Sequence, residues 1–253
     1  MNTLKQKLEE FANSELLAIN SSSIESINEL NQKFADLAPY FLSGGYIKVR
    51  NEYYIYPTTI EFYFHSENPK GVKDDIVYHR KDRVMNENLS LPYFPIMSLH
   101  AHSSGFDITF EKEGQYRASA LIREYQIWDK NNSCWLKWGA VIHNIKGEQK
   151  KVFCFLNYDD ANRIIQIKND KTPINTQVYY LKTFLNGFVM GDNDIIWEDA
   201  RTLLEAMDLT PPKPRLRVYD PKNNEQWKDA RYDEPRSRLW SFSRKEPVPK
   251  PIH

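Results

Sequence analysis

The sequence predicts an α+β protein, a single domain with a mixed, mainly antiparallel sheet in its middle. Three observations support this. Apolar residues recur at helical spacing over residues 3–18 and 24–37, aromatic and β-branched stretches follow as far as residue 168, and helical spacing returns in 176–190 and 194–207. We therefore expect an N-terminal helical pair (1–42), an α+β core of catalytic type (43–210) and a proline- and aromatic-rich tail (211–253), which packs on the core or extends from it.

The helical pattern stops at Ser43-Gly44-Gly45, and short strand-like segments begin there. The expected strands are 46–50, 53–56, 59–65, 96–101, 106–110, 118–127, 136–142, 151–156 and 164–168. Between Asn68 and Pro95 the chain is polar. A loop of that length inside one domain is usually functional or mobile.

The charge is balanced over the whole chain and uneven along it. Lys and Arg together number 34, as do Asp and Glu, so no global charge favours nucleic acid or membrane. Residues 211–253 carry 11 basic and 6 acidic side chains, a net +5, so the tail is the basic part. Cys134 and Cys154 lack disulfide or zinc spacing, and no apolar run resembles an export signal or membrane span. We expect a cytoplasmic monomer that does not associate with a membrane.

One strand carries a carboxylate within an aromatic run. In Thr59–His65, written TIEFYFH, Glu61 and Tyr63 leave the strand on one face, while Ile60, Phe62 and Phe64 leave it on the other. Two readings follow. Either the strand is half buried and Glu61 faces solvent, or Glu61 faces a cavity, where it could act as a general base beside Tyr63.

Further polar clusters follow along the chain. They are Tyr78-His79-Arg80, the segment Leu99–Phe110 (LHAHSSGFDITF) and Arg123, which ends the apolar run Ala120–Ile122. His65, His79, His100 and His102 fall within 38 residues, so a metal site is one alternative, although no HExxH motif accompanies them. The sequence contains no nucleophile elbow, P-loop or dinucleotide fingerprint, and we expect no cofactor.

In this order, the clusters resemble the alkyladenine (3-methyladenine) DNA glycosylase family. That family has a strand with Glu-x-Tyr, a histidine in the next loop, an aromatic hairpin with a small polar residue, and a strand ending Leu-(Leu/Ile)-Arg. The matching residues here are Glu61-Phe62-Tyr63, His79, the hairpin with Asp107, and Leu121-Ile122-Arg123. The resemblance covers about residues 57–128, half of the chain at most.

The resemblance implies a role for each matched residue. Glu61 would be the general base for the water that attacks the sugar C1′, and Arg123 would position that water or a phosphate. Tyr63 and His79 would hold the flipped base between them or by hydrogen bonds. The hairpin Ser98–Phe110 would approach the minor groove and fill the gap that the flipped nucleotide leaves.

This chain departs from the family pattern at the hairpin. The family has Asn where this chain has Asp107, which would add a second carboxylate to the catalytic site near Glu61. His100, His102 and Phe106 replace the tyrosines that stack on the base, so we expect the pocket to accept a different base. The N-terminal helices and the tail have no counterpart in the family.

The sequence therefore predicts a monofunctional DNA glycosylase, which hydrolyses the N-glycosidic bond of a flipped modified base in double-stranded DNA. The base is an alkylated purine or a phage-type modified base, and the protein serves repair or phage defence. The residues expected to contact DNA are Arg80, Ser103, Ser104, Arg215, Arg217, Arg236 and Arg238. The alternatives are a non-catalytic nucleic-acid or nucleotide-binding protein, and a metal-dependent hydrolase or nuclease built on His79, His100, His102 and Asp107.

Overall fold

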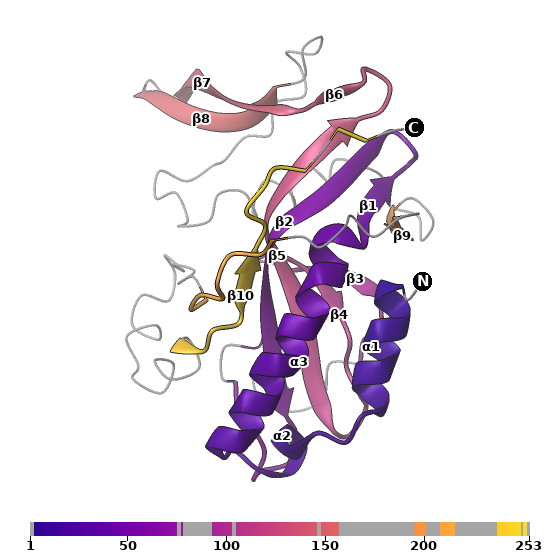
Figure 1. The fold of residues 1–253 in the computed structure, drawn as a ribbon. Helices are drawn as coiled ribbons and strands as arrows, with labels where there is room; N and C mark the ends of the chain where they lie inside the picture. Colours follow the sequence, from indigo (N-terminus) through magenta and orange to yellow (C-terminus); the bar gives the residue numbers. More distant parts are fainter. Residues whose placement is uncertain are drawn as a thin grey trace.

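A computed structural model describes residues 3–74, 77, 93–102, 105–145, 148–156, 195–200, 208–215, 237–248 and 250–251. For 100–102, 105–106, 137–145 and 148–156 it gives the backbone alone. Within these residues, N-terminal helices pack on an eight-stranded antiparallel sheet that nearly closes into a barrel (Figure 1). None of the helices in these ranges is both long and apolar enough to cross a membrane.

The helices are α1 (Leu4–Asn13), α2 (Leu17–Asn20) and α3 (Ile24–Ser43). The two long helices begin at side-chain caps, because the first backbone N–H groups of a helix need acceptors. Thr3 and Gln6 form a capping box at α1, and the Ser23 hydroxyl accepts from the N–H of Ser26 at α3. The predicted N-terminal helical pair is confirmed, with α2 as an additional short turn of helix between its members.

The strands of the main sheet follow the order β3-β4-β5-β2-β1-β9, with β10 also paired to β2 and β6 to β5. Their bounds are β1 (Gly45–Val49), β2 (Tyr53–Ser66), β3 (Ser98–His102), β4 (Gly105–Thr109), β5 (Tyr116–Asp129), β6 (Cys134–Trp135), β9 (Ile195–Asp199) and β10 (Ser241–Ser243). Strands β7 (Lys137–Ile145) and β8 (Glu148–Leu156) form a separate antiparallel pair.

One face of the sheet packs against the helices. Ile60, Phe62 and Phe64 of β2 are fully buried there, as the alternation in the sequence predicts. The Phe34 ring of α3 stacks on Phe62 with centroids 4.5 Å apart, and Phe41 meets the edge of the same ring. Helix burial thus fixes which face of β2 is apolar, and Glu61 and Tyr63 must leave on the other.

The expected helix at 194–207 is wrong for its first part. Residues 195–199 form β9, which pairs with β1 over all five residues. The reason is tertiary: Trp197 packs against the core, and the backbone of β9 pairs with β1. Helical spacing of apolar residues in a short segment does not exclude a strand. Residues 201–207, the expected helix at 176–190 and the expected strand at 164–168 lie outside the described residues.

One stretch of the tail, residues 237–243, belongs to the core. Strand β10 lies beside the middle of β2, with Ser241 opposite Glu61. Trp240 is fully buried, meets the edge of Phe34, and donates from Nε1 to Oδ1 of Asn31 on α3 at 2.7 Å. The chain from 237 to 243 therefore completes the sheet and the core.

Candidate functional site

Around Glu61, the second face of the sheet carries polar side chains that are also buried. Along the strand register, Glu61 of β2 lies opposite Leu121 of β5, which lies opposite Asp107 of β4. The next row joins Tyr63, Ser119 and Thr109 in the same way. Directly paired residues of antiparallel strands share a face, so the register brings Glu61, Tyr63 and Asp107 to one side.

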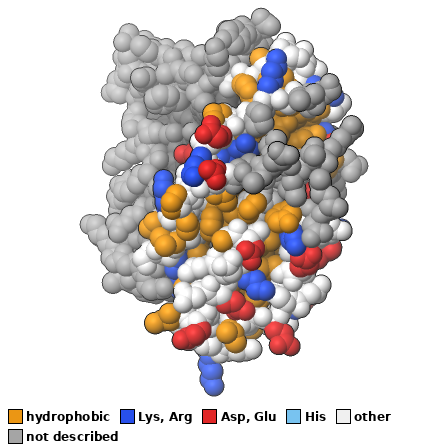
Figure 2. Space-filling view, in the orientation of Figure 1, with side chains coloured by type: hydrophobic (Ala, Val, Ile, Leu, Met, Phe, Trp, Pro, Cys, Tyr) orange, Lys and Arg blue, Asp and Glu red, His pale blue; other side chains and the backbone are white. Residues whose placement is uncertain are grey.

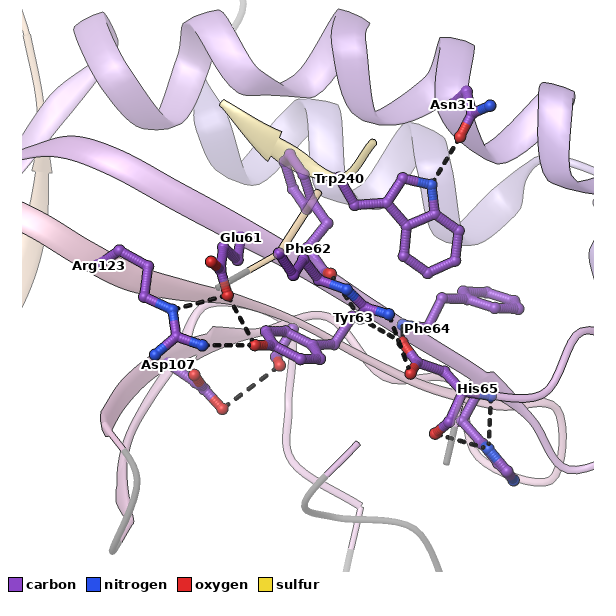
Figure 3. Close-up of polar contacts among 12 residues, drawn as sticks. Asn31, Glu61, Phe62, Tyr63, Phe64, His65, Asp107, Arg123 and Trp240 are labelled. Atoms are coloured by element: carbon purple, nitrogen blue, oxygen red, sulfur yellow. Dashed lines mark hydrogen bonds and ion pairs between the residues drawn. The ribbon is translucent and has the colours of Figure 1, made fainter. Parts of the chain in front are cut away.

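Glu61 is the centre of a tight three-residue cluster (Figure 3). Its Oε2 lies 2.6 Å from Nε of Arg123 and accepts a hydrogen bond of 2.8 Å from the Tyr63 hydroxyl. The same hydroxyl accepts from Nη2 of Arg123 at 2.9 Å. The side chains of Glu61 and Arg123 are no more than 1% exposed. The reading in which Glu61 faces solvent is therefore wrong.

Arg123 reaches this position because the strand pairing is irregular there. Thr59 pairs with Glu124 and the next residue, Ile60, pairs with Ile122, so Arg123 is the extra residue of a bulge in β5. A bulge bends its strand and re-aims the side chains at that point. In this bulge, the Arg123 side chain points towards the neighbouring strand β2, where it contacts Glu61.

The charges within the cluster balance. Burial alone lowers the pKa of the Arg123 guanidinium, but the Glu61 carboxylate and the Tyr63 hydroxyl outweigh that effect, so its pKa is raised and its charge is secure. Burial raises the pKa of Tyr63, and Glu61 adds to the rise against the opposing effect of Arg123. Tyr63 therefore remains a neutral hydrogen-bond donor at physiological pH.

The cluster borders the protein surface at Tyr63. Unlike Glu61 and Arg123, Tyr63 is partly exposed. Nη1 of Arg123 is buried and has no hydrogen-bond partner among the described residues. The arrangement thus combines a carboxylate, a buried guanidinium donor and an aromatic ring that a molecule from outside can reach.

Asp107 lies in the same row as Glu61 but does not contact it. Leu121 stands between them, and two strand spacings separate their backbones by about 10 Å. Asp107 is 3% exposed and accepts from the Ser119 hydroxyl at 3.4 Å. Glu61 and Asp107 therefore do not form the expected pair of adjacent carboxylates, although both lie on the same face of the sheet.

A second buried ion pair holds the tail beside the cluster. The guanidinium of Arg215 forms a bidentate contact with the Asp74 carboxylate, and both side chains are fully buried. It also lies 4.7 Å from the centre of the Tyr63 ring. The partner of Arg215 is therefore the Asp74 carboxylate, whereas the sequence predicts a DNA phosphate as its partner. Arg238 is 8% exposed and lies over Trp240. We therefore assign neither arginine to DNA.

Sequence reasoning missed three buried charges on this face. Besides Asp74, these are Arg117 and Glu111, joined by a 2.9 Å contact from Nη1 to Oε2. Arg117 is two positions from Ser119 on β5, and that even spacing was the available signal. In the sequence, Arg117 and Glu111 do not differ from charged residues on the exposed face of a strand.

Several predicted site residues cannot be placed. His79, Arg80, Ser103, Ser104, Arg217 and Arg236 lie outside the described residues. His100, His102 and Phe106 are described by backbone alone, in β3 and β4, where His100 pairs with Asp107 in the register. Within the described part of the chain, no three His, Cys, Asp or Glu side chains are grouped as a metal site would require.

Comparison with protein-family models, with curated proteins and with solved structures found no match.

Proposed function

We propose that this chain is a DNA glycosylase that hydrolyses the N-glycosidic bond of a modified base flipped out of the duplex, with Glu61 as its catalytic carboxylate. The observation that carries the proposal is the convergence of Arg123 and Tyr63 on Oε2 of Glu61, with contacts of 2.6 and 2.8 Å on a rigid sheet. A general base must be held in one orientation, and two partners on one oxygen do this.

The chemistry needs few groups. Departure of the base leaves an oxocarbenium-like sugar, which a carboxylate stabilises. Glu61 then accepts a proton from the water that adds at C1′. The buried Nη1 of Arg123 is a donor suited to the oxygen of that water or to a phosphate. Tyr63, partly exposed, offers its ring to the extruded base.

Phosphate contacts must come from elsewhere than Arg215 and Arg238, which are buried. On the face seen in Figure 2, acidic and basic side chains are mixed over the described surface. A mixed face gives little non-specific attraction to DNA. Arg80, Arg217 and Arg236 remain the proposed phosphate contacts.

The proposal predicts base release that depends on Glu61. The purified protein would be incubated with DNAs that carry alkylated or phage-type modified bases, and released bases and abasic sites would be measured by mass spectrometry and alkaline cleavage. Wild type should release a base and Glu61→Gln should not. Glu113→Gln is the matched control, because Glu113 is exposed in a turn away from the cluster. Release by the Glu61→Gln variant, or none by wild type from any of these DNAs, would overturn the proposal.

A second candidate is a binding protein without catalysis, in which the same cluster is structural. The complete burial of Glu61 and its compensation by Arg123 favour this reading. It predicts that Glu61→Gln lowers the free energy of unfolding by about 1–3 kcal/mol and leaves ligand binding unchanged.

A further inference from the structure

An aromatic surface lies further along the strands that carry Glu61. Tyr46 of β1, Tyr54 and Tyr56 of β2, Trp128 of β5 and Trp135 of β6 form one connected group, which we call the aromatic platform. Ring centroids are 4.8 Å apart for Tyr46 and Tyr54, and 5.1 Å for Tyr46 and Tyr56. Trp135 is 5.7 Å from Tyr56 and 5.1 Å from Trp128.

The register places these rings on one side of the sheet. Lys48, Tyr54, Trp128 and Trp135 are successive partners across four strands. Four strands at about 4.8 Å spacing make a surface roughly 14 Å wide. The platform therefore crosses the end of the sheet where β6 and the C-terminal end of the chain lie (Figure 1).

The platform and the Glu61 cluster share a face. By simple alternation Tyr56 and Glu61, five residues apart, would point to opposite sides. The pairing of β2 is shifted between Pro57 and Thr59, which inserts one residue and restores the same side. The buried apolar residue Ile55 lies on the core side of β2, as Ile60 does beyond the shift. Tyr56 thus lies on the order of 16 Å from Glu61 along β2 at ~3.3 Å per residue.

Tyr46, Tyr56 and Trp135 are each partly exposed, so the platform offers ring surface to a ligand. Trp128 is 3% exposed, and its indole Nε1 is buried with no hydrogen-bond partner among the described residues. A buried donor of this kind is rare unless some acceptor serves it.

Both signs of charge lie beside the rings, because Glu198 is the direct strand partner of Tyr46. The Lys130 ammonium is 5.8 Å from the Tyr54 ring, and that of Lys250 is 5.4 Å from the Trp128 ring. Lys48 is paired with Glu198 at 2.5 Å. In the described ranges neither Lys130 nor Lys250 has a carboxylate within ion-pair distance. Flat rings edged by uncompensated cations suit a ligand with flat bases and a phosphate backbone.

We propose that the aromatic platform binds a single-stranded segment of nucleic acid, with bases stacked on Tyr46, Tyr56 and Trp135 and phosphates near Lys130 and Lys250. This inference does not depend on catalysis at Glu61. In a nucleic-acid enzyme, the shared face lets one strand run from the platform to the cluster.

Binding of labelled 20-nucleotide single strands, followed by fluorescence anisotropy at low salt, tests the proposal. Wild type should bind. Trp135→Ala and Tyr56→Ala should each weaken binding by roughly 5- to 100-fold, the loss expected for one stacked base. Trp135→Phe should retain most of the affinity, because a ring remains. Tyr40→Ala is the matched control: Tyr40 is a partly exposed tyrosine on α3 with Lys7 5.6 Å from its ring, and its loss should change binding less than twofold.

The lysines have a separate signature. Each phosphate contact to a single strand contributes about 0.7 to the slope of log affinity against log salt concentration. The double variant Lys130→Gln/Lys250→Gln should therefore reduce that slope by about 1.4. Glu113→Gln, at the exposed turn away from the cluster, should bind as wild type does. Failure of the platform shows in single-strand binding and failure of the glycosylase proposal shows in base release, so the two remain distinguishable.

Three results would overturn the proposal. They are no binding of single strands by folded wild type, equal binding by the platform variants and the Tyr40→Ala control, and an unchanged salt slope in the lysine variant. Quenching of tryptophan emission by soluble oligosaccharides without any binding of single strands would identify a carbohydrate surface instead.

Discussion

Nε of Arg123 lies 2.6 Å from Oε2 of Glu61, at a point where neither side chain is more than 1% exposed. A charged side chain that is almost completely buried destabilises the fold unless a partner of opposite charge lies beside it. The pair joins the two longest strands of the sheet, and Tyr63 closes it into a triangle of contacts. Stability and the proposed catalysis therefore depend on the same three side chains.

Glu61→Gln should destabilise the fold, because it removes the negative charge that compensates Arg123. We expect the free energy of unfolding to fall by about 1–3 kcal/mol, the scale of a charged hydrogen bond lost in a buried site. Urea denaturation monitored by circular dichroism measures it. Glu113→Gln, at an exposed turn, should change it by less than about 0.5 kcal/mol. Equal effects of the two substitutions would show that the Glu61 contact does not stabilise the fold.

Tyr63→Phe should alter how stability depends on pH. Burial raises the pKa of Tyr63 in the folded protein above its unfolded value of about 10. At high pH the unfolded chain therefore loses this proton first. The stabilisation is complete below about pH 10 and is lost as the pH rises towards the folded-state pKa. Urea midpoints between about pH 7 and 11 should show the difference between wild type and Tyr63→Phe shrinking above pH 10. A constant difference would contradict the pKa shift.

Asp74→Asn should be severely destabilising, since it removes the negative charge beside the buried Arg215 guanidinium. We expect a loss of about 3–5 kcal/mol. Asp208→Asn breaks a comparable contact of 3.0 Å to Lys245, but those side chains are 80% and 46% exposed. That loss should stay below about 1 kcal/mol. Thermal or urea unfolding compares the two, and similar values would argue against a structural role for Arg215.

Trp240→Ala tests whether the tail completes the core. Trp240 is fully buried against Phe34 and hydrogen-bonded to Asn31, so its truncation should cost about 3–5 kcal/mol. The preceding Leu239 is 45% exposed, and Leu239→Ala should cost under about 1 kcal/mol. Urea denaturation of both variants decides the point. A mild effect at Trp240 would mean that the tail packs only loosely on the core.

Local sequence patterns predicted the parts of the fold that depend on local physics. Helical spacing placed α1 and α3, and alternation on β2 put Phe62 in the core and Glu61 on the opposite face. The same alternation brought Tyr63 to the side of Glu61. These outcomes follow from side-chain direction along one element, and they need no knowledge of its neighbours.

Pairing between distant segments could not be predicted in this way. Helical spacing suggested a helix where β9 completes the edge of the sheet. The residues near Glu61 in the sequence do not indicate that Ser241 pairs with it. Nor does the sequence indicate that Arg215 binds Asp74, which lies 141 positions away. Only the packed chain decides such contacts, because many basic residues are equivalent until burial selects one.

The sequence by itself determined the α+β class, the N-terminal helices and the face of β2 on which Glu61 stands. Tertiary structure alone decided that Arg123 meets Glu61, that strand β5 separates Asp107 from Glu61, and that Arg215 and Arg238 of the tail are buried. The physical reason is that periodicity reports how one element divides its apolar and polar residues. Which polar side chain compensates which buried charge depends on strand register, on a bulge and on long-range pairing.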